Sequence, residues 1–217
     1  MPVTDEGSPD WVFIENYIYS LNYKMPKTTV WLSESMGLKT KEWKGFYLHK
    51  IFKASMGNGI DAIMTSSDIP KYNYVSRDSN GNGVVGFVDE IDEQEPFPEG
   101  ALSLALRGSF LGSCFIQKEP FYTAQNVAVL QEKFPMSKHV KLFIATLIRN
   151  ECKIKYQAFE RELNSHFKKD FIIKLPIKHD KNGIVYDPSH EYSDLGYIPN
   201  WEWIDQYMKS LPYSDKI

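Results

Sequence analysis

Hydrophobic residues recur with helical spacing near both ends of the chain. Successive members of each stripe lie three, four and three positions apart: Trp11, Ile14, Ile18 and Leu21 in the first, and Trp201, Ile204, Met208 and Leu211 in the second. This spacing places four apolar side chains on one face of an α-helix. Pro9 and Pro199 stand at the expected helix entrances, where a missing N–H leaves no hydrogen bond unmade. Each stretch is therefore predicted to form an amphipathic helix.

The two predicted helices are copies of one sequence. Residues 9–23 and 199–213 match at seven of fifteen positions without a gap, and the matches include Trp and Tyr. One interpretation is that two unrelated helices bury aromatic stripes in a common core. The duplication favours a different one, in which a connector helix joins copies of a larger unit or docks each copy on a shared partner.

Between the two helices the pattern is mainly that of short β-strands separated by Gly-, Pro- and Asn-rich turns. Strands are predicted over residues 60–64, 72–75, 84–88, 101–106, 113–117, 126–130 and 171–177, after a strand or short helix over 43–52. Helical spacing predicts a helix over 137–150 and, after a kinked stretch, a shorter one over 160–167. The predicted fold class is α+β, a β-rich domain with a few packed helices, flanked by two repeated amphipathic helices.

These patterns divide the chain into four segments. Residues 1–24 hold the first helix, 25–41 a linker, 42–180 the main domain, and 181–217 a loop and the second helix. At 217 residues the chain is long enough to bury a substantial core in its main domain.

The net charge of −3 hides an uneven distribution of charged residues. Six acidic residues and no basic one fall between Asp89 and Glu99, whereas the segment from Lys133 to Lys181 holds twelve Lys or Arg and five Asp or Glu. A basic segment is expected of a phosphate-binding face, because neutralised phosphates release counterions. The alternative is an ordinary solvated helix face.

Cysteine usage and hydropathy suggest where the protein resides. Cys114 and Cys152 lack the spacing of a metal site, and a chain of this size does not need a disulfide to fold. Both are expected to be reduced thiols in the cytoplasm. The start is acidic and has no secretory core, and no run approaches eighteen apolar residues, so neither export nor a membrane span is expected.

Several short motifs resemble ligand or catalytic sites but lack the context that such sites need. Residues 81–86 spell the dinucleotide-binding glycine pattern, but a strand is predicted to follow them where that motif needs a helix. Residues 78–89 resemble a calcium loop without helical flanks. Residues 187–190 lack the second proline and the aromatic of the adenine methyltransferase motif. The five histidines show no ligand spacing, so the residues predict no enzyme activity and no metal.

The predicted turns carry side chains suited to nucleic acid. Arg77 lies on one turn, Arg107 and Ser109 lie at a glycine-rich one, and Gln125 lies on a third. Arg, Asn and Gln make paired hydrogen bonds to base edges, while Lys, Ser and backbone N–H groups bind phosphates.

Several softer motifs are shared with one family. They are Trp43-x-x-Phe46-x-Leu48-x-x-Ile51-Phe52, residues 82–88, Arg107-Gly108-Ser109, Pro120-Phe121-Tyr122, Asn126-Val127, residues 143–148, residues 173–176 and the ending from Trp201 to Ser214. In this combination the chain resembles the specificity (S) subunits of type I restriction-modification systems, especially the compact ones of type IIB, BcgI-like systems. The similarity covers nearly the whole chain.

This resemblance implies a non-catalytic subunit that binds double-stranded DNA. Such subunits contain two target-recognition domains, each reading half of a split site, joined by helices that also bind the methyltransferase subunits. One domain between two helix copies looks like a half-length unit, and it leaves open whether the chain forms a homodimer, pairs with a second specificity half or is a fragment. The unit would position an adenine methyltransferase. No cofactor is expected on this chain, and S-adenosylmethionine and Mg are expected on partner subunits only.

The resemblance and the turn chemistry together give candidate site residues. The expected DNA contacts are Lys71, Tyr72, Tyr74, Arg77, Arg107, Ser109, Gln125, Lys155, Tyr156, Gln157, Arg161, Lys168 and Lys169. The residues expected to face a partner protein or a second copy are Trp11, Tyr17, Trp201, Trp203 and Tyr207.

Two other functions fit the same residues. A protein-only assembly or inhibitor module of a restriction complex would share the scaffold, and its lack of a steep salt dependence with duplex DNA would reveal it. A metal-dependent nuclease would use the short pairs Glu42/Lys44 and Glu151/Lys153, and cleavage tests with magnesium would detect it.

Overall fold

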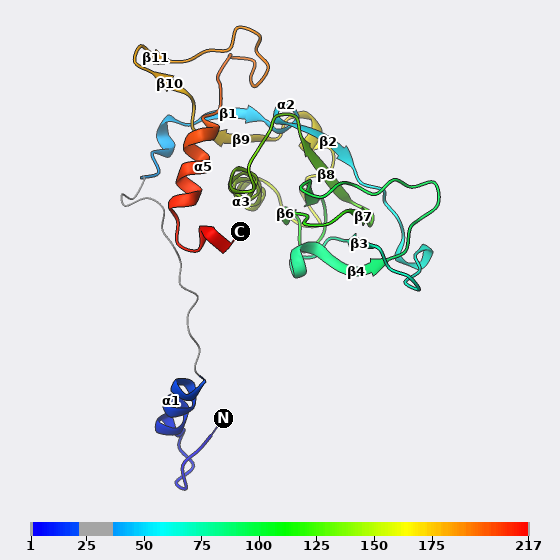
Figure 1. Ribbon diagram of the computed structural model, residues 1–217, viewed down its shortest axis with the longest axis vertical. Helices are drawn as coiled ribbons and strands as arrows, with labels where there is room; N and C mark the ends of the chain where they lie inside the picture. Colours follow the sequence, from blue (N-terminus) through cyan, green and yellow to red (C-terminus); the bar gives the residue numbers. More distant parts are fainter. Residues whose placement is uncertain (1, 22–36, 217) are drawn as a thin grey trace.

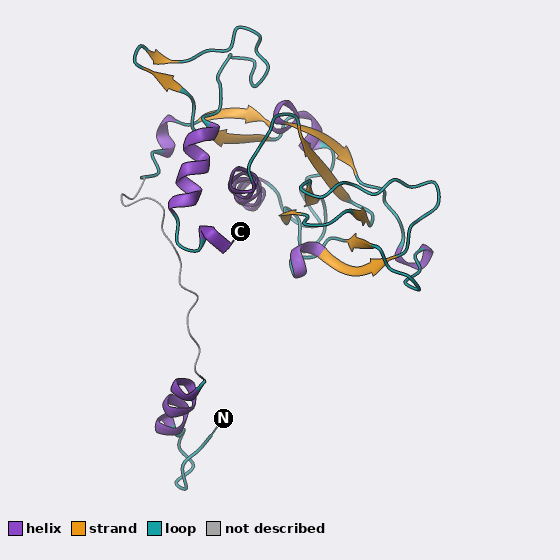
Figure 2. Cartoon of the chain, in the orientation of Figure 1, coloured by secondary structure: helices purple, strands orange, loops and turns teal. Residues whose placement is uncertain are grey.

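Short strands and a long central helix build the main domain (Figures 1 and 2). The computed structural model describes residues 2–21 and 37–216. Its helices are α1 (Trp11–Ser20), α2 (Leu48–Ile51), α3 (Lys138–Lys155), α4 (His166–Lys169) and α5 (Trp201–Ser210). Its strands are β1 (Lys44–Tyr47), β2 (Phe52–Met56), β3 (Tyr72–Val75), β4 (Val84–Val88), β5 (Leu102–Ala105), β6 (Cys114–Ile116), β7 (Phe121–Thr123), β8 (Val127–Glu132), β9 (Ile172–Leu175), β10 (His179–Asp180) and β11 (Gly183–Ile184). Of the predicted linker, residues 25–36 lie outside the described residues.

The described strands form small, mostly antiparallel sheets. The largest has the order β2-β8-β5-β6, and a second has the order β4-β3-β7, in which β3 and β7 run parallel. Two further antiparallel pairs join β1 to β9 and β10 to β11. The combination of several helices with mostly antiparallel sheets confirms the α+β class.

Helix α3 covers the largest sheet and carries much of the core. The Ser137 hydroxyl caps it by accepting a hydrogen bond from the Val140 N–H at 3.2 Å. Its buried face includes Ile144, Ile148 and Cys152, and the helix packs against β6, β9 and α5. Burial raises the pKa of the Cys152 thiol to about 12 and also raises that of Cys114, and both cysteines are free thiols. Among the described residues no helix is both long and apolar enough to cross a membrane.

Some of the elements predicted from the sequence are confirmed, and others are wrong. β3, β4 and β9 occupy the predicted ranges, and α3 begins as predicted but continues to Lys155. The strand predicted over 60–64 is wrong, because residues 62–64 form an exposed 3₁₀ turn. The helix predicted over 160–167 is also wrong, because a loop fills this range up to α4. β7 was not predicted. Residues 81–83 form a 3₁₀ turn that leads into β4, so the glycine pattern there does not begin a long helix.

Helices α1 and α5 have the same local structure. The Asp10 carboxylate accepts from the Phe13 N–H at 2.9 Å, and the Asn200 side chain accepts from the Trp203 N–H at 3.1 Å. In both helices, aromatic rings four residues apart stack with an interplanar angle of 7°. The likeness also extends upstream, since Val3 bridges to Pro9 as Ile177 bridges to Pro199. The proline before each helix therefore takes part in an isolated bridge.

The two helices nevertheless pack differently. In α5, Ile204 and Met208 are buried, and the Trp203 ring packs edge-on against Trp43 in the domain core. α1 lies apart from the domain, and none of its residues is buried (Figure 1). Trp201, Trp203 and Tyr207 are half-buried against the core of their own chain, and their partner role stays a prediction. Their counterparts Trp11 and Tyr17 are 68% and 56% exposed.

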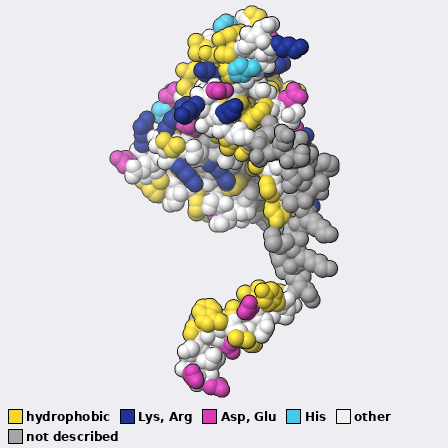
Figure 3. Space-filling view, turned by 90° about the vertical axis from the view of Figure 1, so that its left-hand side faces the viewer, with side chains coloured by type: hydrophobic (Ala, Val, Ile, Leu, Met, Phe, Trp, Pro, Cys, Tyr) yellow, Lys and Arg dark blue, Asp and Glu magenta, His cyan; other side chains and the backbone are white. Residues whose placement is uncertain are grey.

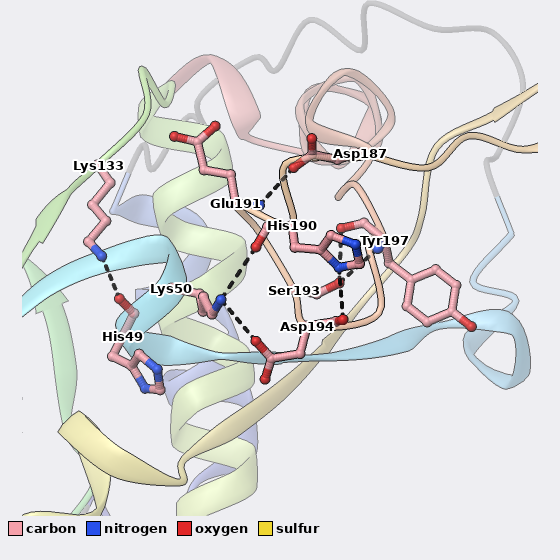
Figure 4. A network of polar contacts seen from close by, with 9 residues as sticks. All are labelled: His49, Lys50, Lys133, Asp187, His190, Glu191, Ser193, Asp194 and Tyr197. Atoms are coloured by element: carbon pink, nitrogen blue, oxygen red, sulfur yellow. Dashed lines mark hydrogen bonds and ion pairs between the residues drawn. The ribbon is translucent and has the colours of Figure 1, made fainter.

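A long loop before α5 is held by polar contacts to α2 (Figure 4). The Lys50 ammonium donates to the His190 carbonyl at 3.3 Å and lies 2.9 Å from the Asp194 carboxylate. Within the loop, the Asp187 carboxylate accepts from the Ser189 hydroxyl and from the Glu191 and Ser189 N–H groups, which holds the pKa of this carboxyl below its usual value. These contacts order a segment that has little regular structure.

Candidate nucleic-acid interface

Gly108 and Gly112 shape the turn that joins β5 to β6. Their φ angles of +76° and +82° fall in the left-handed region, which glycine adopts without steric strain. The Leu111 N–H donates to the Gly108 carbonyl at 3.0 Å, and the Gly112 N–H donates to the Ala105 carbonyl at 2.9 Å. The tight turn leaves Arg107 and Ser109 exposed.

Glu162 fastens this turn to the loop that follows α3. Its Oε1 accepts hydrogen bonds from the backbone N–H groups of Gly108 at 3.0 Å and Phe159 at 3.4 Å. Its Oε2 lies 3.4 Å from Nε of Arg107. Only 16% of the Glu162 side chain is exposed, so these charged contacts are partly shielded from water. The ion pair uses Nε and leaves the two terminal nitrogens of the Arg107 guanidinium outside it.

Arg107 borders an open hollow of about 370 Å³. The hollow is lined by Met56, Leu106, Arg107, Asn126, Asn164, Ser165, Phe167 and Lys168. None of these residues is acidic. Guanidinium and amide groups suit base edges, and ammonium and hydroxyl groups suit phosphates, so this lining has both kinds of DNA-binding chemistry.

Other predicted contacts lie around the same hollow. A Cβ built on Gly108 would lie 3.7 Å from Nη1 of Arg77, which places that guanidinium beside the turn. Gln125 precedes Asn126 and is exposed, and Lys169 follows Lys168 in α4 and is exposed. The structure therefore brings together predicted residues from four separate segments: Arg77, Arg107, Ser109, Gln125, Lys168 and Lys169.

The loop after α3 adds Gln157 and Arg161 to this end of the domain. The Gln157 N–H donates to the Arg161 carbonyl at 2.8 Å, which closes the loop. The Arg161 guanidinium lies 5.8 Å from the centre of the Tyr156 ring. Tyr156 was predicted to contact DNA, but its ring stacks on Phe171, and burial raises its pKa. Tyr156 therefore anchors the loop instead of presenting its ring.

Three other predicted contacts lie elsewhere, on β3 and just before it. Tyr74 is 5% exposed and donates its hydroxyl to the Ile60 carbonyl at 2.7 Å, so the prediction that it contacts DNA is wrong. The central position of β3 in its sheet causes this burial. Tyr72 packs edge-on against Tyr122, and Lys71 bonds the Glu90 carboxylate at 3.1 Å.

The basic segment does not form one continuous positive face. Lys141 lies 2.5 Å from the Glu132 carboxylate, and Lys155 lies 2.6 Å from that of Glu151. The helix α3 lysines are thus partly neutralised within the chain. Of the predicted basic contacts in this segment, Lys168 is the one that lines the hollow.

Sequence reasoning did not select five residues that the structure places at this site. They are Asn126, Phe159, Glu162, Asn164 and Ser165. A usable signal existed for Asn126, because it directly follows Gln125 on the predicted polar turn, at the start of the strand predicted over 126–130. Glu162 and Phe159 carry no such signal, because their roles depend on a contact across 54 residues of sequence.

Comparison with known protein families shows which family the chain belongs to. Residues 40–186 match the model of the type I restriction modification DNA specificity domain. The chain belongs to this family. The match covers well over half of the sequence and includes the hollow and both loops around it. Specificity domains of this family are not catalytic, in agreement with the prediction of a non-catalytic chain.

Solved structures similar to this specificity domain are known. They include the type I restriction-modification system S subunit from M. genitalium (14% identity, TM-score 0.43, covering 76% of this chain and 38% of that one). The HsdS subunit from Thermoanaerobacter tengcongensis has 13% identity, a TM-score of 0.46 and coverages of 68% and 36%. A structure described for the complex assembly and conformational transition of the type I R-M system has 12% identity, a TM-score of 0.47 and coverages of 76% and 39%. The chain thus spans less than half the length of each of these structures. No curated protein sequence matches it.

Proposed function

We propose that this specificity domain binds double-stranded DNA sequence-specifically through the hollow beside Arg107, reading half of a split site. The observation that carries the proposal is the convergence of Arg, Asn, Ser and Lys side chains from separate segments on one hollow without an acidic lining residue. Membership in a family of DNA specificity domains supports it. In this proposal Arg107, Asn126 and Asn164 read the base sequence. Lys168 and Lys169 of α4 contribute affinity for any sequence by binding phosphates.

The salt dependence of duplex binding tests this proposal. Each phosphate contact contributes about 0.9 to the slope of log K against log salt concentration. The double variant Lys168→Ala/Lys169→Ala is expected to weaken binding to all sequences equally and to flatten the slope by about one per lysine removed. Fluorescence anisotropy with labelled duplexes at several salt concentrations measures both quantities.

A matched control for this prediction is Lys181→Ala, which removes a lysine from the turn of the β10–β11 hairpin. That variant is expected to leave the slope unchanged. A wild-type protein whose duplex binding has no salt dependence would contradict the proposal and favour the protein-only assembly or inhibitor module. Cleavage of DNA by this chain in magnesium would favour the nuclease.

We also propose that α1 mediates pairing with a second specificity half, either a second copy or another chain. The support is that α1 repeats the cap, the ring stack and the upstream bridge of α5 but leaves its apolar stripe exposed. In Figure 3 the α1 segment shows hydrophobic and acidic side chains and no basic one, in keeping with the absence of Lys and Arg from residues 1–21. An exposed apolar stripe of this kind is typical of a protein-binding helix.

Substitution of Ile18 by Asp tests the role of α1. Ile18 lies on the stripe and is 59% exposed, so a charge there should not disturb the main domain but should abolish pairing. The control is Tyr19→Asp, since Tyr19 is 76% exposed and lies off the stripe. Light scattering after size-exclusion chromatography is expected to show a dimer for wild type and Tyr19→Asp and a monomer for Ile18→Asp. Equal masses for all three proteins would contradict pairing of two copies through α1, and co-purification of a second specificity chain with wild type but not with Ile18→Asp tests pairing with another chain.

In the cell, we expect the paired unit to work in the cytoplasm and to position an adenine methyltransferase subunit on DNA. S-adenosylmethionine and Mg are expected on the partner subunits. Co-purification with a methyltransferase, followed by sequencing of methylated adenines in the host genome, tests this part of the proposal. Loss of the methylated motif in an Arg107 variant would tie the modification to the hollow.

A further inference from the structure

Phe159 occupies the apex of the loop that follows α3. The bond between the Gln157 N–H and the Arg161 carbonyl, at 2.8 Å, closes the loop beneath it. Phe159 has a φ angle of +65°, and 80% of its surface is exposed. A bulky residue in the left-handed region has a strained backbone. The exposed phenyl ring adds no stabilisation from burial, so this conformation of Phe159 destabilises the free protein.

The position of Phe159 is fixed by contacts on both sides. Below it, the Tyr156 ring stacks on Phe171 with a centroid distance of 5.9 Å and anchors the loop to the domain. Beside it, Oε1 of Glu162 accepts from the Phe159 N–H and from the Gly108 N–H. One carboxylate oxygen therefore joins the backbone of Phe159 to the turn that carries Arg107. The exposed ring is part of a braced structure.

The surroundings of Phe159 favour nucleic acid over an apolar protein surface. Arg161 is exposed on the same loop, and Arg107 is held by the same Glu162 side chain. The exposed Glu160 follows the ring in the chain, but the two arginines beside a protruding apolar ring match the chemistry of a base stack, which has apolar faces and flanking phosphates. A docking patch for protein would instead be expected to contain neighbouring apolar residues.

We infer that Phe159 is a wedge that inserts between two neighbouring base pairs of the bound duplex and partly unstacks them. Glu162 is the positioning residue that holds both the wedge and Arg107 in place. This inference rests on the proposed DNA-binding function and deepens it, because it adds a stacking contact and a local distortion of DNA to the base-edge contacts. Such a wedge makes recognition depend on how easily one base step unstacks.

Duplexes that carry 2-aminopurine at successive positions of the bound site test the wedge. Unstacking raises 2-aminopurine fluorescence, so wild-type protein is expected to increase the signal at one step. Phe159→Ala should lose this increase and bind about ten- to a hundredfold more weakly, while Phe159→Trp should keep both. The matched control is Phe87→Ala, because Phe87 is another exposed phenylalanine, at 62%, on β4.

The Glu162 variants test positioning separately from folding. Glu162→Gln keeps an oxygen that accepts from Gly108 and Phe159, so it should retain the fluorescence increase, whereas Glu162→Ala should lose it. Wild-type binding without an increase at any step, or an unchanged signal with Phe159→Ala, would overturn the wedge and leave the DNA-binding function standing. Absence of salt-dependent duplex binding by the wild type would overturn both. An unchanged fluorescence increase with Glu162→Ala would refute the positioning role of Glu162.

Discussion

Replacement of Arg107 by alanine is expected to remove most of the discrimination between the correct DNA site and a site with one altered base pair. A well-placed guanidinium contributes about 1–3 kcal/mol of discrimination through two hydrogen bonds to one base, which corresponds to about ten- to a hundredfold in affinity ratio. Glu162 contacts Nε of Arg107 and thus leaves the paired terminal nitrogens for this task. Competition binding with matched and mismatched duplexes measures the effect.

Arg107→Lys separates charge from geometry in this experiment. Lysine keeps the positive charge but lacks the planar fork of the guanidinium. It is therefore expected to preserve the salt slope of the wild type and still lose the preference for the correct base. If both variants ranked the duplexes as the wild type does, Arg107 would not read the sequence.

Replacement of Gly112 by alanine is expected to destabilise the folded domain by about 3 kcal/mol. Two effects add at this position. The φ angle of +82° is unfavourable for a residue with a side chain, and the new Cβ would overlap Cβ of Cys152 and lie 3.0 Å from its Sγ. Cys152 is fully buried on α3, so neither its side chain nor the new Cβ at position 112 has space to move away. Urea denaturation followed by circular dichroism measures the free energy of unfolding.

Gly59→Ala is the matched control, because it has the unfavourable φ angle but not the steric overlap. Gly59 has a φ angle of +74° but has no neighbouring atom within 4 Å of the position of a Cβ. Its replacement should therefore cost about 1 kcal/mol, from the backbone conformation alone. Equal losses for the two variants would show that the turn and α3 are not in tight contact at Gly112.

The sequence predicted those parts of the fold that depend on neighbouring residues. The α1 and α5 helices followed from apolar spacing and entrance prolines, and the start of α3 followed from apolar spacing. β3 and β4 followed from runs of aromatic and β-branched residues. The class of the domain and its family followed from the combination of these elements with soft motifs along the chain.

The errors arose where distant contacts decide the structure. β7 forms because it pairs in parallel with β3, almost fifty residues earlier, and its three strand-favouring residues are too short a run to predict a strand by themselves. Residues 60–64 are apolar except for Asp61, but they have no partner strand among the described residues, and 62–64 form an exposed turn. The α1 and α5 stripes are almost the same in sequence, so the sequence could not show that one is buried and the other exposed.

The candidate site was predicted in part for the same reason. Arg107 and Lys168 stood out because arginine on a glycine-rich turn and lysine in a basic segment are local features, and the structure brings both to one hollow. Tyr74 looked similar to them in sequence, but its place in the middle of a sheet buries it. Glu162 was not predicted, because its role depends on the contact between the loop after α3 and the turn that contains Gly108.

Selection from a library of duplexes with a randomised region tests the central claim most directly. The wild-type protein is incubated with the library at physiological salt, and the bound duplexes are recovered and sequenced over several rounds. Sequence-specific recognition through the hollow predicts enrichment of one short motif by the wild type, and a motif that has lost one base position with Arg107→Ala. Recovery of duplexes without any shared motif by the wild type, at the same total binding, would contradict it.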